Sequence, residues 1–263
     1  MKRKLAPILL VCAAFIINAC QQSDPINDTS TRQISPATLQ KIKALGFDVT
    51  HMPPVRVDNG YRIEGDIYLT DANLNSMHQD AAGTSPEQYW GGNLVTGTPR
   101  NITIYIAPTF TSSYIVALNS AIAQYNALGI SLTFTRVATS AGANIIITRL
   151  PVAQETQGVF ASAGFPSGGN PYGSILLNGI LISTFGVSVN GLSTVLVHEI
   201  GHCIGLRHTN TGDPQCPLTG PGVGGILVPG TPVVDPNSVM RPCHDGIFRP
   251  FSQHDKTMLN YLY

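Results

Sequence analysis

The sequence has little charge and no excess of either sign. Only 11% of its 263 residues are Asp, Glu, Lys or Arg, and the formal net charge is zero. Proteins that bind nucleic acid need a basic surface, so nothing in this balance points to a nucleic-acid partner. Glycine and proline are plentiful instead, with 26 and 19 residues. This composition is typical of a loop-rich exported protein and argues against a helical bundle.

Cysteine is absent from residues 21–197, and three cysteines follow that stretch. No two of these three form a C-x-x-C pair, which disfavours a structural zinc site built from cysteines. An odd number in an oxidising compartment predicts one disulfide and one free thiol. Cys216 with Cys243 is the predicted pair, and Cys203 with Cys216 is the alternative.

The N-terminal apolar run is too short to span a membrane. It extends from Leu5 to Ala19 behind three basic residues, which predicts a signal peptide at residues 1–19. The stretch INAC resembles a bacterial lipobox, so we expect Cys20 to be lipidated. Residues 20–36 are polar and aperiodic, which predicts a flexible tether. We therefore expect a lipoprotein of the bacterial cell envelope, held to the membrane only by its lipid anchor, or a secreted protein.

Acidic residues are scarce in the second part of the chain, since residues 91–263 hold only six of the 15. This shift predicts a boundary near Trp90, with a pro-region or N-terminal accessory region at 37–90 and the main domain at 91–263. We interpret the carboxylates of the first region, including Glu64 and Asp66, as solvated surface groups. The alternative is that one of them shields a cleft in the main domain.

Hydrophobic periodicity predicts alternating strands and helices. Strands are expected at 101–108, 131–137, 143–150 and 175–178, with helices at 37–48, 111–129, 192–206 and 251–263. Residues 61–74 have the pattern of a strand. Asn190 or Ser193 is expected to cap the helix at 192–206, and Ser252 with Asp255 has the spacing of a capping box.

The stretch HEIGHCIGLRH at residues 198–208 points to a metal. His198 and His202 are four apart, so both project from one helix face and can grip one ion. Gly205 can take a left-handed conformation that ends the helix and returns His208 as a third ligand. Three imidazoles leave zinc an open position, as in catalytic sites. Glu199 is then placed to take a proton from a water molecule that the zinc activates.

The pattern H-E-x-x-H-x-x-G-x-x-H resembles that of the metzincin clan of zinc endopeptidases. With the stretches FPSGGNPYGSILL and VPGTPVVDPNSVM, the chain is similar to the dual-action HEIGH metallopeptidase family over most of residues 37–263. The resemblance implies an α+β catalytic domain at 91–263 with a twisted mixed sheet, an active-site helix and a C-terminal helix. It also implies one zinc ion and a Met-turn at Met240, beneath the metal.

The residues after Met240 depart from some metzincins. Pro242 stands where astacins and serralysins have tyrosine, so no tyrosine ligand is expected. We interpret His244 as a loop histidine that contacts backbone, with lining of the cleft and oxyanion stabilisation as the alternative. Residues 172–179 are the stretch most similar to the edge strand with which metzincins pair their peptide substrate.

The sequence therefore predicts a monomeric zinc endopeptidase that acts on proteins or peptides. The alternative is a surface lipoprotein that binds a partner and retains the zinc site without turnover. The intact Glu199 favours the enzyme, because a site that only binds has no need of a general base.

Overall fold

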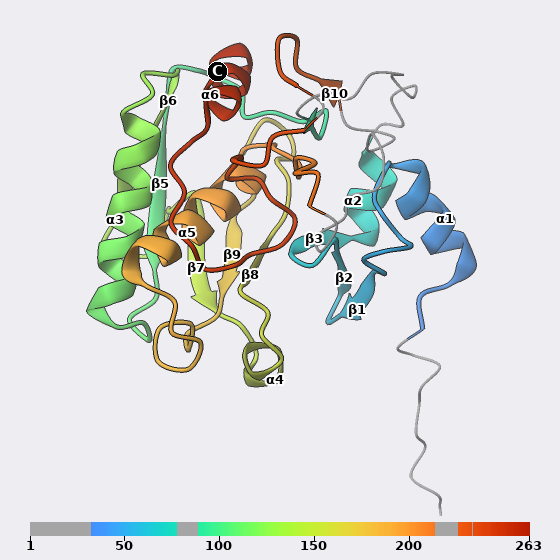
Figure 1. The fold of residues 1–263 in the computed structure, drawn as a ribbon, viewed down its shortest axis with the longest axis horizontal. Helices are drawn as coiled ribbons and strands as arrows, with labels where there is room; N and C mark the ends of the chain where they lie inside the picture. The colour runs from blue at the N-terminus through green and yellow to red at the C-terminus, as the bar shows by residue number, and fades with distance from the viewer. Residues whose placement is uncertain (1–32, 78–88, 214–225, 233) are drawn as a thin grey trace, which may run out of the picture. The chain divides into compact units, whose positions relative to one another are not determined.

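A mixed eight-stranded sheet forms the frame of the protein (Figure 1). Its strand order is β1-β2-β3-β8-β9-β7-β5-β6. The strands are β1 (Val55–Val57), β2 (Gly60–Ile63), β3 (Ile67–Thr70), β5 (Arg100–Ile106), β6 (Leu132–Arg136), β7 (Ile145–Arg149), β8 (Ala161–Ala163) and β9 (Ser174–Leu177). β5, β6, β7 and β9 run parallel, while β8 is antiparallel to β9. β4 (Tyr89–Trp90) and β10 (Ile226–Leu227) form a separate antiparallel pair.

The structure, a computed structural model, describes residues 33–77, 89–213, 226–232 and 234–263. Within it, Ile34–Tyr263 form one compact unit. The predicted signal peptide, the lipidation site Cys20 and most of the tether lie outside the described residues, as does Cys216.

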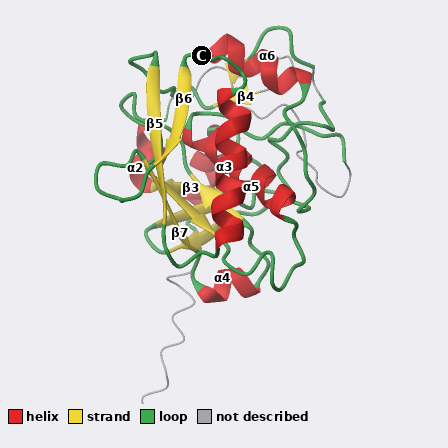
Figure 2. Cartoon of the chain, turned by 90° about the vertical axis from the view of Figure 1, so that its left-hand side faces the viewer, coloured by secondary structure: helices red, strands yellow, loops and turns green. Residues whose placement is uncertain are grey.

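Two long helices cover one face of the sheet (Figure 2). α3 (Ser112–Asn126) and α5 (Val189–Cys203) pack against each other and contribute to one apolar core with β5, β7 and β9. Along β5, Ile102, Ile104 and Ile106 are buried while the residues between them are partly exposed, so the strand turns one apolar face to the helices. The Tyr125 hydroxyl donates to the Val197 carbonyl (2.8 Å), which ties the two helices together.

The first part of the chain has a core of its own. α1 (Pro36–Ala44), α2 (Asp71–Ser76) and the β2–β3 hairpin bury a second apolar cluster, which also takes in Phe165 of the main domain. β3 pairs in parallel with β8, with Ile67 opposite Ala163, so this region extends the main sheet. Residues 61–74 do not form the single strand that their sequence pattern predicts. Glu64 and Gly65 have φ values of +50° and +91°, and these left-handed residues turn the chain between β2 and β3.

The remaining elements largely confirm the expected ones. The helices predicted at 111–129 and 251–263 are α3 and α6 (Gln253–Leu262), and the capping box of Ser252 with Asp255 is present. α4 (Val152–Thr156) is an additional short helix. The cap of α5 is Ser188, earlier than predicted, because its side chain accepts from the Gly191 amide. The α+β architecture with a mixed sheet is confirmed.

The predicted edge strand is wrong. β9 lies between β7 and β8, so the stretch 172–179 has neighbours on both sides. The strand that meets the first part of the chain is β8, whose outer side is occupied by β3.

Candidate active site

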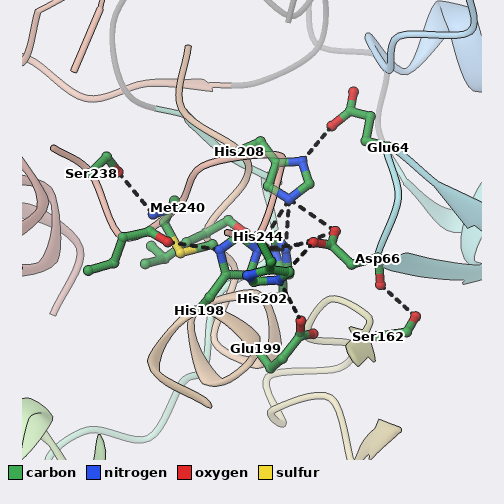
Figure 3. Close-up of polar contacts among 12 residues, drawn as sticks. Glu64, Asp66, Ser162, His198, Glu199, His202, His208, Ser238, Met240 and His244 are labelled. Atoms are coloured by element: carbon green, nitrogen blue, oxygen red, sulfur yellow. Dashed lines mark hydrogen bonds and ion pairs between the residues drawn. The ribbon is translucent and has the colours of Figure 1, made fainter. Parts of the chain in front are cut away.

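Three histidine side chains converge on one point above α5 (Figure 3). The Nε2 atom of His198 lies 2.9 Å from that of His202 and 3.2 Å from that of His208. The remaining Nε2 pair, His202 with His208, is 3.2 Å apart. All three residues are buried, so their lone pairs face one another away from bulk water. Nitrogen lone pairs at such separations repel unless a cation lies among them.

Hydrogen bonds on the far side of each ring fix this orientation. His198 Nδ1 lies 2.8 Å from the Val239 carbonyl oxygen, and His202 Nδ1 lies 2.8 Å from that of Leu206. A carbonyl oxygen can only accept, so each Nδ1 carries the proton and each Nε2 keeps its lone pair. This second layer of contacts is the usual way in which metal-binding histidines are oriented.

A turn at the end of α5 brings His208 to the other two. The helix ends at Cys203, and Gly205 has φ +112°, as the sequence predicts for a left-handed residue. The Leu206 amide donates to the Gly201 carbonyl (2.9 Å), which closes the turn. Glycine is required at 205 because a Cβ there would lie 2.6 Å from the Asn93 carbonyl oxygen.

Met240 packs directly against α5, within the loop before α6. It is fully buried, and a Cβ on Gly201 would lie 2.7 Å from its sulfur atom. The Thr209 amide donates to the Met240 carbonyl (2.8 Å). The Asp255 carboxylate in the first turn of α6 accepts from the Ser238 hydroxyl (2.7 Å) and the Val239 amide (3.0 Å). The C-terminal helix therefore anchors the loop that carries Met240.

Glu199 faces the same space and is fully buried. Neither of its oxygens accepts a hydrogen bond from the described part of the chain, although Oε1 lies 3.4 Å from His244 Nε2. Burial raises the pKa of Glu199, and its neighbouring imidazoles only partly oppose this. A carboxylate that is held without competing donors and with a raised pKa is suited to accept and release a proton.

Asp66 occupies the open side of the histidine cluster, a position that agrees with the alternative of a carboxylate shielding the cleft. Its Oδ1 lies 3.0 Å from His208 Nε2 and 3.6 Å from His202 Nε2, and its Oδ2 lies 3.4 Å from His198 Nε2. The interpretation of Asp66 as a solvated surface group is wrong, since the residue is 3% exposed.

The backbone around Asp66 explains its position. The left-handed turn at Glu64 and Gly65 directs the chain into the site, and the Asp66 carbonyl oxygen accepts from the Ala163 amide (3.1 Å) and the Ser162 hydroxyl (2.5 Å). Glu64 is buried as well, and its Oε2 lies 3.1 Å from His208 Nδ1. Two acidic residues around a glycine, between the buried Ile63 and Ile67, were the sequence signal of this role.

The charges of the site are strongly coupled. Burial alone would raise the pKa of Asp66, but the positive charge of His208 and the contacts with the histidines hold it well below its usual value. Burial lowers the pKa of His198, and the nearby His244 and His202 lower it further. Burial also opposes protonation of His208, yet Asp66 and Glu64 raise its pKa to about 10. With only protein groups present, the site thus takes up positive charge next to the two carboxylates.

This donor set fits a zinc ion. Asp66, His198, His202 and His208 each offer one ligand atom, and these four atoms lie within 4.8 Å of one another. Imidazole nitrogen and carboxylate oxygen are both zinc ligands, and tetrahedral bonds of about 2.0–2.1 Å place nitrogens about 3.3 Å apart. The separations of 2.9–3.2 Å between the imidazole nitrogens are close to this value.

His244 lines the cleft, which confirms that part of the alternative stated above and not the interpretation of it as a loop histidine with backbone contacts. Its ring centroid lies 4.4 Å from that of His198, and its ring stacks on Phe160 at 5.7 Å with an interplanar angle of 4°. The side chain is 12% exposed and lines a cavity of about 470 Å³ that Asp66 also lines. No periodic or spacing signal in the sequence marks this loop residue.

The cysteines separate into two kinds. Cys203 is a buried free thiol at the end of α5, so the alternative pairing of Cys203 with Cys216 is wrong. Cys243 is disulfide-bonded. Its predicted partner Cys216 lies outside the described residues, so the pairing itself stays a prediction.

Comparison with known proteins gives a family match. The profile of the family described as dual-action HEIGH metallo-peptidase matches residues 61–263. No curated protein sequence matches the chain. Among solved structures, myroilysin is similar at 15% identity and a TM-score of 0.45, covering 75% of this chain and 98% of its own. High choriolytic enzyme 1, a hatching enzyme zinc-protease from the medaka fish Oryzias latipes, is similar at 16% identity and a TM-score of 0.38, covering 62% and 88%.

Proposed function

Because this chain belongs to the dual-action HEIGH metallopeptidase family, we propose that it is a zinc-dependent endopeptidase that uses Glu199 as its general base. His198, His202 and His208 hold the ion in this proposal, and Met240 forms the apolar floor beneath them. The observation that carries the proposal is the convergence of three buried Nε2 atoms beside the buried carboxylate of Glu199.

The zinc ion supplies a Lewis acid, which acidifies a water molecule and polarises the peptide carbonyl. Glu199 takes the proton from the water oxygen as this oxygen attacks the carbonyl carbon. It then gives the proton to the amide nitrogen as the C–N bond breaks. Burial raises the pKa of Glu199, which favours its protonated form more than in an exposed carboxylate and so supports the transfer of the proton to the amide nitrogen.

The peptide substrate is proposed to bind along β8. A three-residue strand whose outer side pairs with β3 has backbone groups that an extended peptide can use instead. Since backbone pairing reads no side chain, such a substrate is bound with little sequence preference. The main domain at 91–263 would then be the catalytic domain.

Residues 37–90 are proposed to keep the full-length chain inactive. The hairpin lies on β8, and the Asp66 carboxylate stands among the imidazole nitrogens where the substrate carbonyl has to enter. Matrixins use a cysteine for this purpose, and residues 21–197 contain none. Here a carboxylate from a left-handed turn would fill the fourth position around the ion, and its displacement would open the site.

The export of this protein rests on its N-terminal sequence. A signal peptide at 1–19 and lipidation of Cys20 are proposed from the residues alone and lie outside the described part of the chain. No helix among the described residues is long and apolar enough to cross a membrane.

The test compares Glu199→Gln with His202→Ala in the full chain and in a chain that also carries Asp66→Asn. Glu199→Gln should keep about one zinc per chain and lose roughly 10²–10⁴-fold in casein-peptide hydrolysis, as expected for removal of a general base. His202→Ala should lose zinc and thermal stability together, because bound metal stabilises the folded state. Unchanged hydrolysis in Glu199→Gln would reject the mechanism. If the wild-type and Asp66→Asn chains both bound zinc and neither hydrolysed peptide, the partner-binding lipoprotein would be favoured.

A further inference from the structure

His244 Nε2 is a buried polar atom within ion-pair distance of two carboxylates. It forms no hydrogen bond with the described residues, although it is 3.3 Å from Asp66 Oδ2 and 3.4 Å from Glu199 Oε1. A bare nitrogen lone pair facing two carboxylate oxygens would be repelled by both, so Nε2 carries the hydrogen of the ring on this side. This donor lines the cavity and forms no hydrogen bond of good geometry to either carboxylate, so a ligand oxygen that enters the cavity can accept from it.

The Asp66 carboxylate marks the point at which that donor is aimed. Oδ2 lies between two imidazoles, 3.4 Å from His198 Nε2 and 3.3 Å from His244 Nε2. Oδ1 lies on the side of His208, at 3.0 Å. Two oxygens on one carbon, one at the ligand cluster and one shared with His244, resemble the two oxygens of a hydrated peptide carbonyl. His244 therefore stands beside His198, on the side of the cluster where Asp66 Oδ2 and Glu199 lie.

The loop around His244 is held rigidly. Phe160 stacks flat on the ring, and the preceding Cys243 is disulfide-bonded. Asp245 accepts two hydrogen bonds from the Arg249 guanidinium, at 2.6 Å and 2.5 Å. A donor stabilises a developing charge best when its position is fixed before the reaction, because no reorganisation is then needed.

We propose that the Nε2–H group of His244 binds the oxygen of the scissile carbonyl and stabilises the oxyanion formed on it. In this step the water oxygen bonds to the carbonyl carbon and its proton passes to Glu199. The electron pair of the C=O bond moves to the oxygen, which accepts the hydrogen bond from His244. The C–N bond then breaks, and the amide nitrogen takes the proton from Glu199. This assignment rests on the proposed endopeptidase function.

The experiment uses the full chain with Asp66→Asn, so that the carboxylate does not compete, and compares His244→Ala, His244→Gln and His244→Asn. His244→Ala should lower kcat about 10²–10³-fold with little change in KM, the effect of removing one oxyanion donor. Gln carries its amide nitrogen where Nε2 lies and should recover part of this loss. Asn places its nitrogen nearer to Nδ1 and should not.

Two inhibitors give a readout other than turnover. A phosphinic peptide presents two oxygens on a tetrahedral centre, whereas a mercaptoacyl peptide presents one sulfur. Calorimetry should show that His244→Ala weakens the phosphinic peptide about as much as it lowers kcat, and weakens the mercaptoacyl peptide less than threefold. Zinc should stay near one per chain in every His244 variant.

The outcomes separate this assignment from the proposed function. Equal weakening of both inhibitors, or an unchanged kcat in His244→Ala, overturns the role of His244 while leaving the endopeptidase intact. Loss of zinc in His244→Ala also overturns it, because His244 would then be a ligand. Failure of the parent chain to bind either inhibitor or to cleave peptide overturns the proposed function itself.

Discussion

Two glycines in the zinc motif serve different purposes at the scale of the single residue. Gly201 lies between the proposed ligands His198 and His202, and its missing side chain leaves room for the sulfur of Met240. Gly205 ends α5 in a left-handed conformation and also lies against the Asn93 carbonyl. One glycine allows close packing from outside the helix, and the other sets the direction in which the chain leaves it.

Gly205→Ala should destabilise the protein and weaken zinc binding together. The left-handed conformation costs an L-residue about 1–2 kcal/mol, and the contact with the Asn93 carbonyl adds overpacking of about 1–3 kcal/mol. Relief of this contact moves the turn that carries His208. Zinc titration against a competing chelator and thermal unfolding measure the two effects.

Gly97→Ala is the matched control, because Gly97 has φ +72° but nothing within 4 Å of the added methyl group. Gly97→Ala should lower the stability only by the cost of the left-handed backbone conformation and should leave the zinc affinity unchanged. Wild-type zinc affinity in Gly205→Ala would mean that His208 does not depend on this turn, and would remove it from the proposed ligands.

At the scale of elements, Arg207 fastens α1 to the zinc motif. Its guanidinium donates to the carbonyls of Leu45 (2.9 Å) and Gly46 (3.0 Å) and lies over the Phe47 ring, 3.9 Å from its centroid. Arg207 is 3% exposed and immediately precedes His208. The end of the first helix is therefore tied to the residue next to a proposed ligand.

Arg207→Met should loosen the first part of the chain more than the catalytic core. Two buried carbonyls would lose their donor, at roughly 1–3 kcal/mol each. Hydrogen exchange at residues 42–48 should accelerate strongly, while exchange in α3 changes little. Arg207→Lys is the control, since one ammonium can still reach a carbonyl and should give an intermediate rate. Equal acceleration in α3 would contradict the local role of this residue.

Elements whose residues are close in sequence could be predicted, and those made by distant contacts could not. α3, β5 and α6 carry periodic patterns, and α6 also has a local capping box. The three proposed histidine ligands fall within eleven residues. The β2–β3 turn depends on left-handed residues that no repeating pattern announces. β8 has three residues, too few for an alternation. Asp66 and His244 reach the site only through the pairing of β3 with β8 and the loop after Met240.

At the scale of the whole molecule, the two cores meet where the chemistry is proposed to occur. The core of the first part of the chain contains Phe165 and supports the β2–β3 hairpin, which carries Asp66. The core of the main domain contains α5, which carries His198 and His202. The sheet is continuous across this junction, because β3 adds to β8. In the proposed function a peptide binds along that edge only after the hairpin leaves it, so we expect the contacts of Asp66 to stabilise the full-length chain and to lower its activity.

Asp66→Asn in the full-length chain should therefore raise activity and lower stability at the same time. The amide is neutral and a weaker metal ligand, so it yields the site to substrate more readily, and peptide hydrolysis should rise at least about tenfold. Loss of contacts to a charged group costs about 1.5–3 kcal/mol, which lowers the melting temperature by about 3–12 °C in a chain of this size.

The control for Asp66→Asn is Asp58→Asn, an exposed position in the same region whose φ of +37° asparagine tolerates. Asp58→Asn should change neither the rate of peptide hydrolysis nor the melting temperature. Zinc content, measured in parallel, should stay near one per chain in both variants, since three imidazoles remain. A substitution that merely damaged the fold would lower melting temperature and activity together. Such a joint fall in Asp66→Asn would show that this carboxylate supports the structure and does not restrain the enzyme.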